Sequence, residues 1–116
     1  MKYILYIEPK ATPRPRVARG RAYYPKEYQT WKKLATSILP ALEPPTQTIH
    51  MVFVFPRPKR LKQGSREPHK KRPDIDNLVK SVFDLFDFDD GVISHFSAEK
   101  VYAASNEAPC IELHWT

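Results

Sequence analysis

All six aspartates of this chain lie between Asp74 and Asp90, where they flank one strongly amphipathic segment. After Asp76, apolar residues recur at helical spacing, and at about 100° per residue they form one continuous arc. The members of this arc are Leu78, Val79, Val82, Phe83, Leu85 and Phe86. On the opposite side fall Asn77, Lys80, Ser81 and Asp84. The segment therefore predicts a helix that packs one face on a core and presents Lys80, one turn after Asp76, to solvent.

The length of the chain indicates one small domain, residues 1–116, because a chain of this size buries a single core. Apolar patterns predict strands at residues 2–8, 22–24, 47–55, 98–103 and 110–115. In the strand at 47–55, one core face is predicted, formed by the alternating residues Ile49, Met51, Phe53 and Phe55. A first helix is predicted from Pro25 to about Leu39, with its buried side formed by Tyr28, Trp31, Leu34, Ala35 and Ile38. Apart from the short strand at 22–24, the order is βαβαββ. It predicts an α+β fold in which two main helices pack on one face of a small mixed β-sheet.

Positive charge is concentrated in two proline-rich segments of the chain. There are 19 Lys and Arg residues, and the net charge is +6. Six of these cations lie in a basic arm, residues 10–26, and eight lie in a basic loop, residues 56–73. Residues 10–21 of the arm and the whole of the basic loop are expected to be irregular. The charge of both segments favours a phosphate-rich partner, with nucleic acid first. The residues expected to contact DNA phosphates are Arg14, Arg16, Arg19, Arg21, Lys70, Lys71 and Arg72.

Two further features bear on the compartment. The apolar run at residues 3–7 is too short for a signal-peptide core or a membrane span, so no membrane partner is expected. The single cysteine, Cys110, has no second thiol for a disulfide or a zinc site. Both features favour a reducing, cytoplasmic location.

The first aspartates of the cluster suggest a divalent-metal site, since Mg²⁺ prefers oxygen ligands. In an extended segment, residues two apart point to the same side. We therefore expect Asp74 and Asp76 to project together while Ile75 turns toward the core. The alternative is that Asp76 or Asn77 is only the N-cap of the helix.

Asp89 and Asp90 place further carboxylates in a turn after the helix. Because the two ends of one helix cannot meet, the chain must fold back after Gly91, so that a strand near residues 93–102 brings Asp90 alongside the first pair. For Lys80 there are again two hypotheses. It is either a solvated lysine paired with Asp76 or Asp84, or a cation that stabilises charge on a phosphate in the transition state. Among the histidines, only His95 is retained as a candidate general base.

The aspartates and Lys80 belong to a longer sequence motif. From Arg72 to Asp84 the sequence reads Arg-Pro-Asp-Ile-Asp-Asn-Leu-Val-Lys-Ser-Val-Phe-Asp, and Asp89-Asp90-Gly91-Val92-Ile93 follows. This combination closely resembles the RusA-type Holliday junction resolvases of bacteria and their prophages. The beginning of the chain is also similar to that family, with a short first strand, then Pro13-Arg14-Pro15-Arg16, then Tyr24-Pro25 before the first helix. The resemblance covers essentially the whole chain.

The resemblance implies metal-binding catalytic carboxylates at Asp74, Asp76 and Asp90, with Lys80 as the supporting catalytic lysine. It also implies a homodimer, Mg²⁺ as cofactor with Mn²⁺ as a substitute, and incision of four-way DNA junctions by a bacterial or prophage-encoded protein. Whether Asp89 shares the role of Asp90 stays open. A two-fold dimer suits the substrate, because it places two sites on the two equivalent strands of a junction in one encounter.

Three functions are compared on this basis. The first is a Mg²⁺-dependent, structure-selective endodeoxyribonuclease that resolves Holliday junctions by paired symmetric nicks in DNA recombination and repair. The second is a non-catalytic, basic DNA-binding protein whose acidic residues only cap a helix and line a solvated turn. The third is a metal-dependent nuclease that acts on other branched DNA, such as flaps or replication forks. Nicking of a four-way junction after addition of Mg²⁺ separates the first function from the second.

Overall fold

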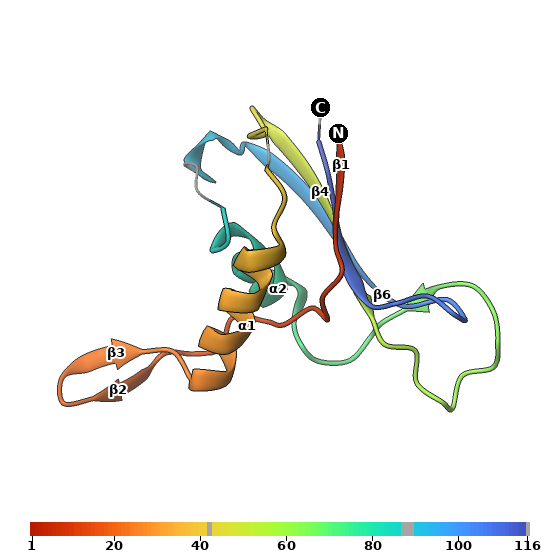
Figure 1. Cartoon of the computed structure of the whole chain (residues 1–116), viewed down its shortest axis with the longest axis horizontal. Coiled ribbons are helices and arrows are strands. Elements are labelled where there is room, and N and C mark those ends of the chain that lie inside the picture. Colours follow the sequence, from red (N-terminus) through yellow and green to blue (C-terminus); the bar gives the residue numbers. More distant parts are fainter. Residues whose placement is uncertain (42, 87–89, 116) are drawn as a thin grey trace.

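The structure is a computed structural model, and it describes residues 1–41, 43–86 and 90–115, with the backbone alone for Asp90. Its elements are, in order, β1 (Lys2–Leu5), β2 (Arg16–Ala18), β3 (Arg21–Tyr23), α1 (Lys26–Ile38), β4 (Thr48–Phe55), β5 (Glu67–Pro68), α2 (Ile75–Phe83), the 3-10 helix η1 (Asp90–Val92), β6 (His95–Tyr102) and β7 (Cys110–His114). Five strands form one sheet in the order β1-β7-β4-β6-β5, and β2 and β3 form a separate hairpin (Figure 1). The predicted α+β class with a small mixed sheet and two helices is confirmed.

Strand β4 is the centre of the sheet. It runs parallel to β6 and antiparallel to β7. Since two parallel neighbours need a crossover connection, the chain between β4 and β6 must return across the sheet, and this connection carries α2. The register places Phe53 of β4 beside Lys100 of β6, and Val52 of β4 beside Glu112 of β7.

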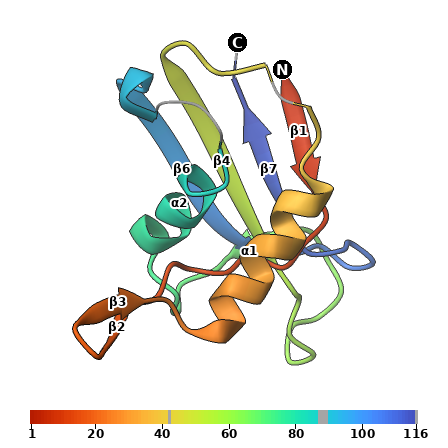
Figure 2. The same ribbon diagram turned by 60° about the vertical axis from the view of Figure 1, so that its left-hand side comes forward.

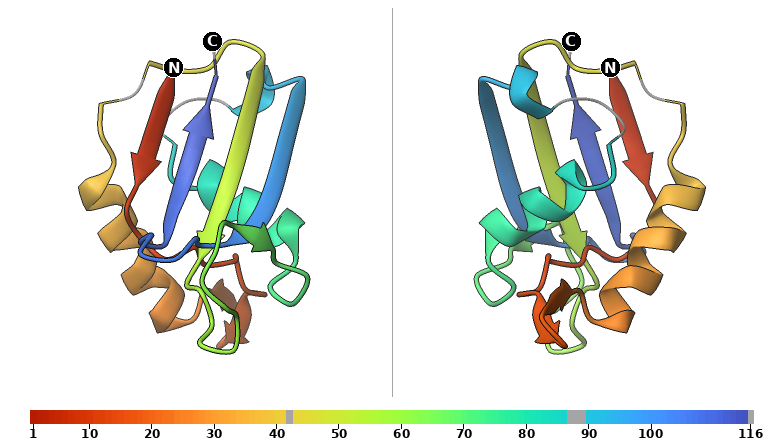
Figure 3. Two further views of the ribbon diagram at one scale, coloured as in Figure 1. Left: turned by 90° about the vertical axis from the view of Figure 1, so that its right-hand side faces the viewer. Right: turned by 90° about the vertical axis from the view of Figure 1, so that its left-hand side faces the viewer.

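Both helices cover the same face of the sheet, as Figures 2 and 3 show. The main core lies between them and the sheet. The predicted inward face of β4 is confirmed, and its residues Ile49, Met51, Phe53 and Phe55 are buried. From α1 the core receives Tyr28, Trp31 and Ala35, and from α2 it receives Leu78, Val79 and Val82. None of the helices in the described part of the chain is long and apolar enough to cross a membrane.

Three residues differ from the predicted faces of the helices. Leu34 and Ile38 of α1 were expected in the core, but they are 54% and 41% exposed. Ser81 of α2 was expected on the solvent-exposed side of the helix but is fully buried. Its hydroxyl donates to the Leu78 carbonyl at 2.7 Å and therefore needs no hydrogen bond to water. Lys80 is exposed, as predicted.

The basic arm is not irregular throughout, in contrast to the expectation. Its strands β2 and β3 pair in antiparallel register and are joined at Arg19 and Gly20. Both turn residues have positive φ, 53° and 74°, which is the requirement of the two-residue type I′ hairpin turn. The hairpin extends away from the sheet (Figure 1).

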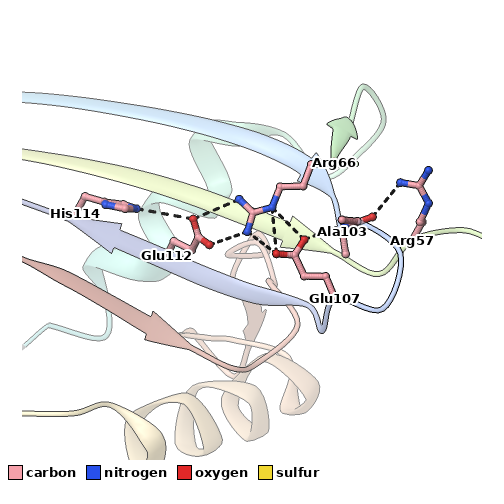
Figure 4. A network of polar contacts seen from close by, with 7 residues as sticks. Arg57, Arg66, Ala103, Glu107, Glu112 and His114 are labelled. Carbon is pink, nitrogen blue, oxygen red and sulfur yellow. Dashed lines mark hydrogen bonds and ion pairs between the residues drawn. The ribbon is translucent and has the colours of Figure 1, made fainter. Parts of the chain in front are cut away.

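The other face of the sheet carries a second, smaller core of Val52, Val54, Ala103 and Cys110. Burial raises the pKa of the Cys110 thiol to about 11, so the thiol stays neutral. Next to this core, Arg66 of the predicted basic loop bridges two glutamates (Figure 4). Its Nη2 lies 2.6 Å from Glu107 Oε2 and 2.7 Å from Glu112 Oε2. The guanidinium therefore ties the loop to β7 and to the β6–β7 connection.

The Arg66 bridge generates a prediction about stability. Hydrogen bonds from Arg66 lower the pKa of both Glu107 and Glu112 from their usual 4.5. We expect Arg66→Met to lower the free energy of unfolding at pH 7 by about 2–3 kcal/mol, because it leaves the poorly solvated Glu112 carboxylate without the guanidinium that binds it. Carboxyl groups with a lowered pKa stabilise the fold above pH 4.5, and this stabilisation disappears as the pH falls through their pKa values in the folded protein.

Urea unfolding of the wild type and Arg66→Met at pH 7 and pH 3 measures this difference. The two proteins should differ strongly at pH 7 and little at pH 3. Arg14→Met is the matched control, since Arg14 is exposed. An equal loss in both variants at pH 7 would show that Arg66 contributes only its charge.

Candidate functional site

The acidic motif forms the start of α2, but the helix begins at an earlier residue than predicted. Asp74 is the N-cap residue, with an extended backbone at φ −69° and ψ 143°, and Asp76 already lies in the first helical turn. The hypothesis that Asp76 or Asn77 is the N-cap is therefore wrong, because the N-cap is Asp74. The side chain of Asp74 makes no capping hydrogen bond. Ile75, expected to turn toward the core, is 38% exposed because it occupies the first helical position instead of an extended one.

Three charged side chains of this motif face solvent. Asp74, Asp76 and Lys80 are all exposed, and the backbone N–H of Asn77 donates to Asp76 Oδ1 at 2.9 Å. Within the described residues, the Lys80 ammonium forms no ion pair with Asp76 or Asp84, in contrast to the hypothesis of a paired surface lysine. Among residues 1–41, 43–86 and 90–115, neither the Asp74 carboxylate nor the Lys80 ammonium has a polar side-chain partner, so both can bind a ligand.

Of Asp89 and Asp90, the structure describes only the backbone of Asp90. Asp89 is outside the described residues, and Asp90 begins η1. The end of α2 lies near the start of β6, where the Phe83 and Phe96 rings are 6.3 Å apart. The start of α2 lies instead near Lys100, which at about 3.3 Å per residue is roughly 17 Å further along β6 than His95. Figure 3 shows η1 and the start of α2 at opposite ends of this strand. The predicted return of the chain therefore does not bring the Asp90 backbone beside Asp74.

The basic arm is attached directly to α2. The backbone N–H of Thr12 donates to the Asn77 carbonyl at 3.0 Å. The Thr12 hydroxyl lies 3.1 Å from the Tyr28 hydroxyl, which donates to Asp84 Oδ2 at 3.2 Å. Asp84, expected to be solvated, thus accepts a hydrogen bond from the core. Burial, together with the neighbouring Asp84 carboxylate, raises the pKa of Tyr28 to about 12, so its phenol stays neutral and structural.

The predicted DNA contacts are available on the surface. The side chains concerned are all exposed, namely Arg14, Arg16, Arg19, Arg21, Lys70, Lys71 and Arg72. In the hairpin, Arg16 pairs with Tyr23 and Ala18 pairs with Arg21, so that Arg16, Arg21 and Tyr23 share one face. An open groove of about 490 Å³ runs from Lys10 and Arg16 of the arm to Pro73, the residue before Asp74.

Not every cation of the basic loop is available. Arg57 donates to the carbonyls of Ser65 at 2.9 Å and Ala103 at 3.1 Å, and it also contacts the Lys62 carbonyl and Glu67. Like Arg66, it holds the loop in place and has few donors left for a phosphate. Neither residue was among the predicted DNA contacts.

His95, the candidate general base, lies away from the acidic motif. It begins β6, and it lines a groove at that end of the sheet together with His50 and His114. His50 Nδ1 lies 2.6 Å from the Ser97 hydroxyl in the same groove. The structure therefore gives no support to His95 as a base for chemistry at Asp74 and Asp76.

One residue near the motif was missed by the sequence interpretation. Lys100 Nζ donates to the carbonyls of Lys71 at 2.6 Å and Pro73 at 2.7 Å, just before Asp74. The signal was present in the strand pattern, where Lys100 falls between Ala98 and Tyr102 on the side that packs on the core. A lysine at such a position requires a polar partner.

The donor set at the start of α2 fits a hard divalent cation. It offers carboxylate oxygens from Asp74 and Asp76 without thiolate or imidazole, and the oxygens of Asp74 have no competing cap bond. No cluster of three His, Cys, Asp or Glu residues suited to a metal occurs among the described residues. One or two protein carboxylates, with open positions for water and phosphate, are the usual arrangement for Mg²⁺, and Asp74 and Asp76 supply that number.

Comparison with known proteins identifies the family. A protein-family model described as Endodeoxyribonuclease RusA matches residues 7–113, which is nearly the whole chain and includes the basic arm, the acidic motif and η1. No match was found among curated individual proteins.

Proposed function

Because the chain belongs to the RusA endodeoxyribonuclease family, we propose that it is a Mg²⁺-dependent enzyme that resolves Holliday junctions by paired symmetric nicks. Family membership makes the chain a nuclease and implies a branched DNA substrate, which argues against the non-catalytic alternative. The observation that supports the proposal most directly is the group of exposed charges at the start of α2, which form no ion pair with any other described residue and lie next to the attached basic arm. Nucleases of this family are metal-dependent, and we propose Mg²⁺, with Mn²⁺ as a substitute.

In the proposed mechanism, Asp74 and Asp76 hold the cation at the start of α2. When bound, a divalent cation makes a water molecule more acidic and neutralises charge on the phosphate oxygens. The phosphodiester bond is broken by attack of water on phosphorus in line with the leaving oxygen. Lys80, one turn after Asp76, directs its ammonium at the non-bridging oxygens, where negative charge develops in the transition state. The arm and the loop bind backbone phosphates without reading the sequence.

The position of the Asp90 backbone and the two-fold symmetry of a four-way junction both support a dimer. We propose a homodimer, because a two-fold enzyme places two sites on a two-fold junction. The start of α2 and η1 lie at opposite ends of β6, so Asp90 of one protomer is too far away to join the Asp74 and Asp76 of the same chain. We therefore assign the third carboxylate of each site to Asp90 of the second copy.

The first test is cleavage of a labelled four-way junction in Mg²⁺, with linear duplex as the substrate control. Asp74→Asn and Asp76→Asn should abolish cleavage and leave junction binding intact, because each removes a ligand and spares the arm. Lys80→Ala should slow cleavage about 100-fold or more at unchanged thermal stability, since this side chain is exposed. Glu99→Gln is the matched control, since Glu99 is an exposed carboxylate of β6 outside the motif, and it should cleave normally. Wild-type rates for Asp76→Asn would refute the assignment.

The second test mixes two inactive variants and addresses the shared site. Asp76→Asn and Asp90→Asn should each be inactive alone. In a mixed dimer, the unchanged Asp74 and Asp76 of one protomer meet the unchanged Asp90 of the other, so one intact site forms. Refolding the two variants together should therefore restore single nicks on a cruciform plasmid, whereas the wild type gives linear product. No recovery in the mixture would mean that each chain carries its own complete site.

The third test concerns the basic surface. Junction affinity should fall with salt at a slope of roughly 0.9 per phosphate contact, because each contact releases counterions. Replacing Arg14 and Arg16 with Gln should remove about two phosphate contacts and therefore lower this slope by roughly 1.8. Replacing Arg60 and Lys62 with Gln removes the same charge from outside the predicted DNA contacts, and it should lower the slope less. Equal slopes for both double variants would show that net charge alone determines binding.

A further inference from the structure

Lys100 occupies an unusual position for a lysine. It lies in β6 beside Phe53 of β4, between Ala98 and Tyr102, and it is half-buried on the face that carries the main core. Its ammonium reaches the carbonyl oxygens of Lys71, at 2.6 Å, and Pro73, at 2.7 Å. The lysine therefore connects the middle of the sheet to the backbone that leads into Asp74.

The same segment is anchored at its beginning by His69. The His69 ring lies between Phe55 and Tyr102, with centroid distances of 4.4 and 4.6 Å, and its backbone N–H donates to the Lys100 carbonyl at 3.0 Å. Within residues 70–73, Lys100 donates to two backbone carbonyls, and the His69 ring also interacts with the backbone of Lys71. Lys100 is the one of these two side chains that reaches Pro73, the residue directly before Asp74.

An ammonium is suited to this task for a physical reason. Two carbonyl oxygens that converge on one point repel each other, and a cation removes the repulsion and binds both. Hydrogen bonds from a charged donor are roughly twice as strong as neutral ones. Since the side chain of Asp74 makes no capping bond, the backbone before it is the main determinant of where its carboxylate lies.

On these grounds we propose that Lys100 is a positioning residue for the metal site, an inference that rests on the proposed function. It does not touch the substrate or the cation. By binding the Lys71 and Pro73 carbonyls it holds the Asp74 carboxylate in place beside Asp76. Misplacement of a catalytic group by about 1 Å can cost a factor of 100 in rate, so an anchor at this point has a large effect on cleavage.

The experiment compares Lys100→Met with Lys33→Met. Both remove one positive charge and keep the unbranched stem, but Lys33 is an exposed residue of α1. Mn²⁺ binding is measured by calorimetry on the full-length protein. We expect affinity to fall at least tenfold in Lys100→Met and to stay unchanged in Lys33→Met. Equal affinity in Lys100→Met and the wild type would overturn the proposal.

Hydrogen exchange measured by mass spectrometry, without metal or DNA, separates positioning from general stabilisation. In Lys100→Met, amide exchange in residues 70–78 should accelerate at least tenfold while exchange in β7 stays unchanged. Equal acceleration throughout the chain would overturn the proposal, because it would make Lys100 an ordinary stabilising residue. Lys100→Gln, which keeps a neutral donor, replaces the Met variant if that variant does not fold.

Different outcomes would contradict the proposed function and the proposed role of Lys100. If the wild type binds Mn²⁺ but cuts no junction, the proposed substrate is wrong and the Lys100 result still stands on affinity and exchange. If the wild type cuts junctions and Lys100→Met binds Mn²⁺ normally, the proposed function survives and the role of Lys100 does not.

Discussion

The packing of α2 on the sheet determines which surface of this protein can work on a substrate. Leu78, Val79 and Val82 are buried against β4 and β6, and each contributes about 1.5–3 kcal/mol by leaving water. A cap or a surface ion pair contributes about 1 kcal/mol or less. The core therefore decides the rotation of the helix, and the charged residues take the positions that remain. Asp76 and Lys80 face solvent because the opposite side of the helix is needed in the core.

The cations of the chain perform two different tasks. Arg57 and Arg66 are bound by carbonyls and carboxylates of the fold, and this allows a long loop to lie against the second face of the sheet. The arginines of the arm are exposed and remain available to a polyanion. A fold with few apolar residues on that second face thus uses ionic contacts to cover it. The sequence alone does not separate the two groups, because both occur in proline-rich, basic segments.

Features that follow from local periodicity were predictable, whereas those that depend on distant partners were not. The spacing of apolar residues predicted the position of α2, the solvent-exposed side of this helix with Lys80, and the inward face of β4. The N-cap was misplaced by two or three residues because Asp74, Asp76 and Asn77 are all good caps, and only the tertiary structure chooses among them. Ser81 was missed because a helical serine can donate to a carbonyl of its own preceding turn, here Leu78, and so enter the core. The strand pattern places Lys100 on the core side, but its partners, the carbonyls of Lys71 and Pro73, are distant in sequence and no local pattern reveals them. For Asp90, the order of elements did not say at which end of β6 the chain would return.

The hydrogen bond between Thr12 and Asn77 gives the basic arm a consequence beyond affinity. Since the arm and the first turn of α2 share this bond, the protein backbone holds the start of the arm at a fixed distance from the carboxylates of α2. In the proposed mechanism, this attachment would place the incision at a constant distance from the phosphates that the arm binds. The branch geometry that accommodates the arm would then select the bond that is broken.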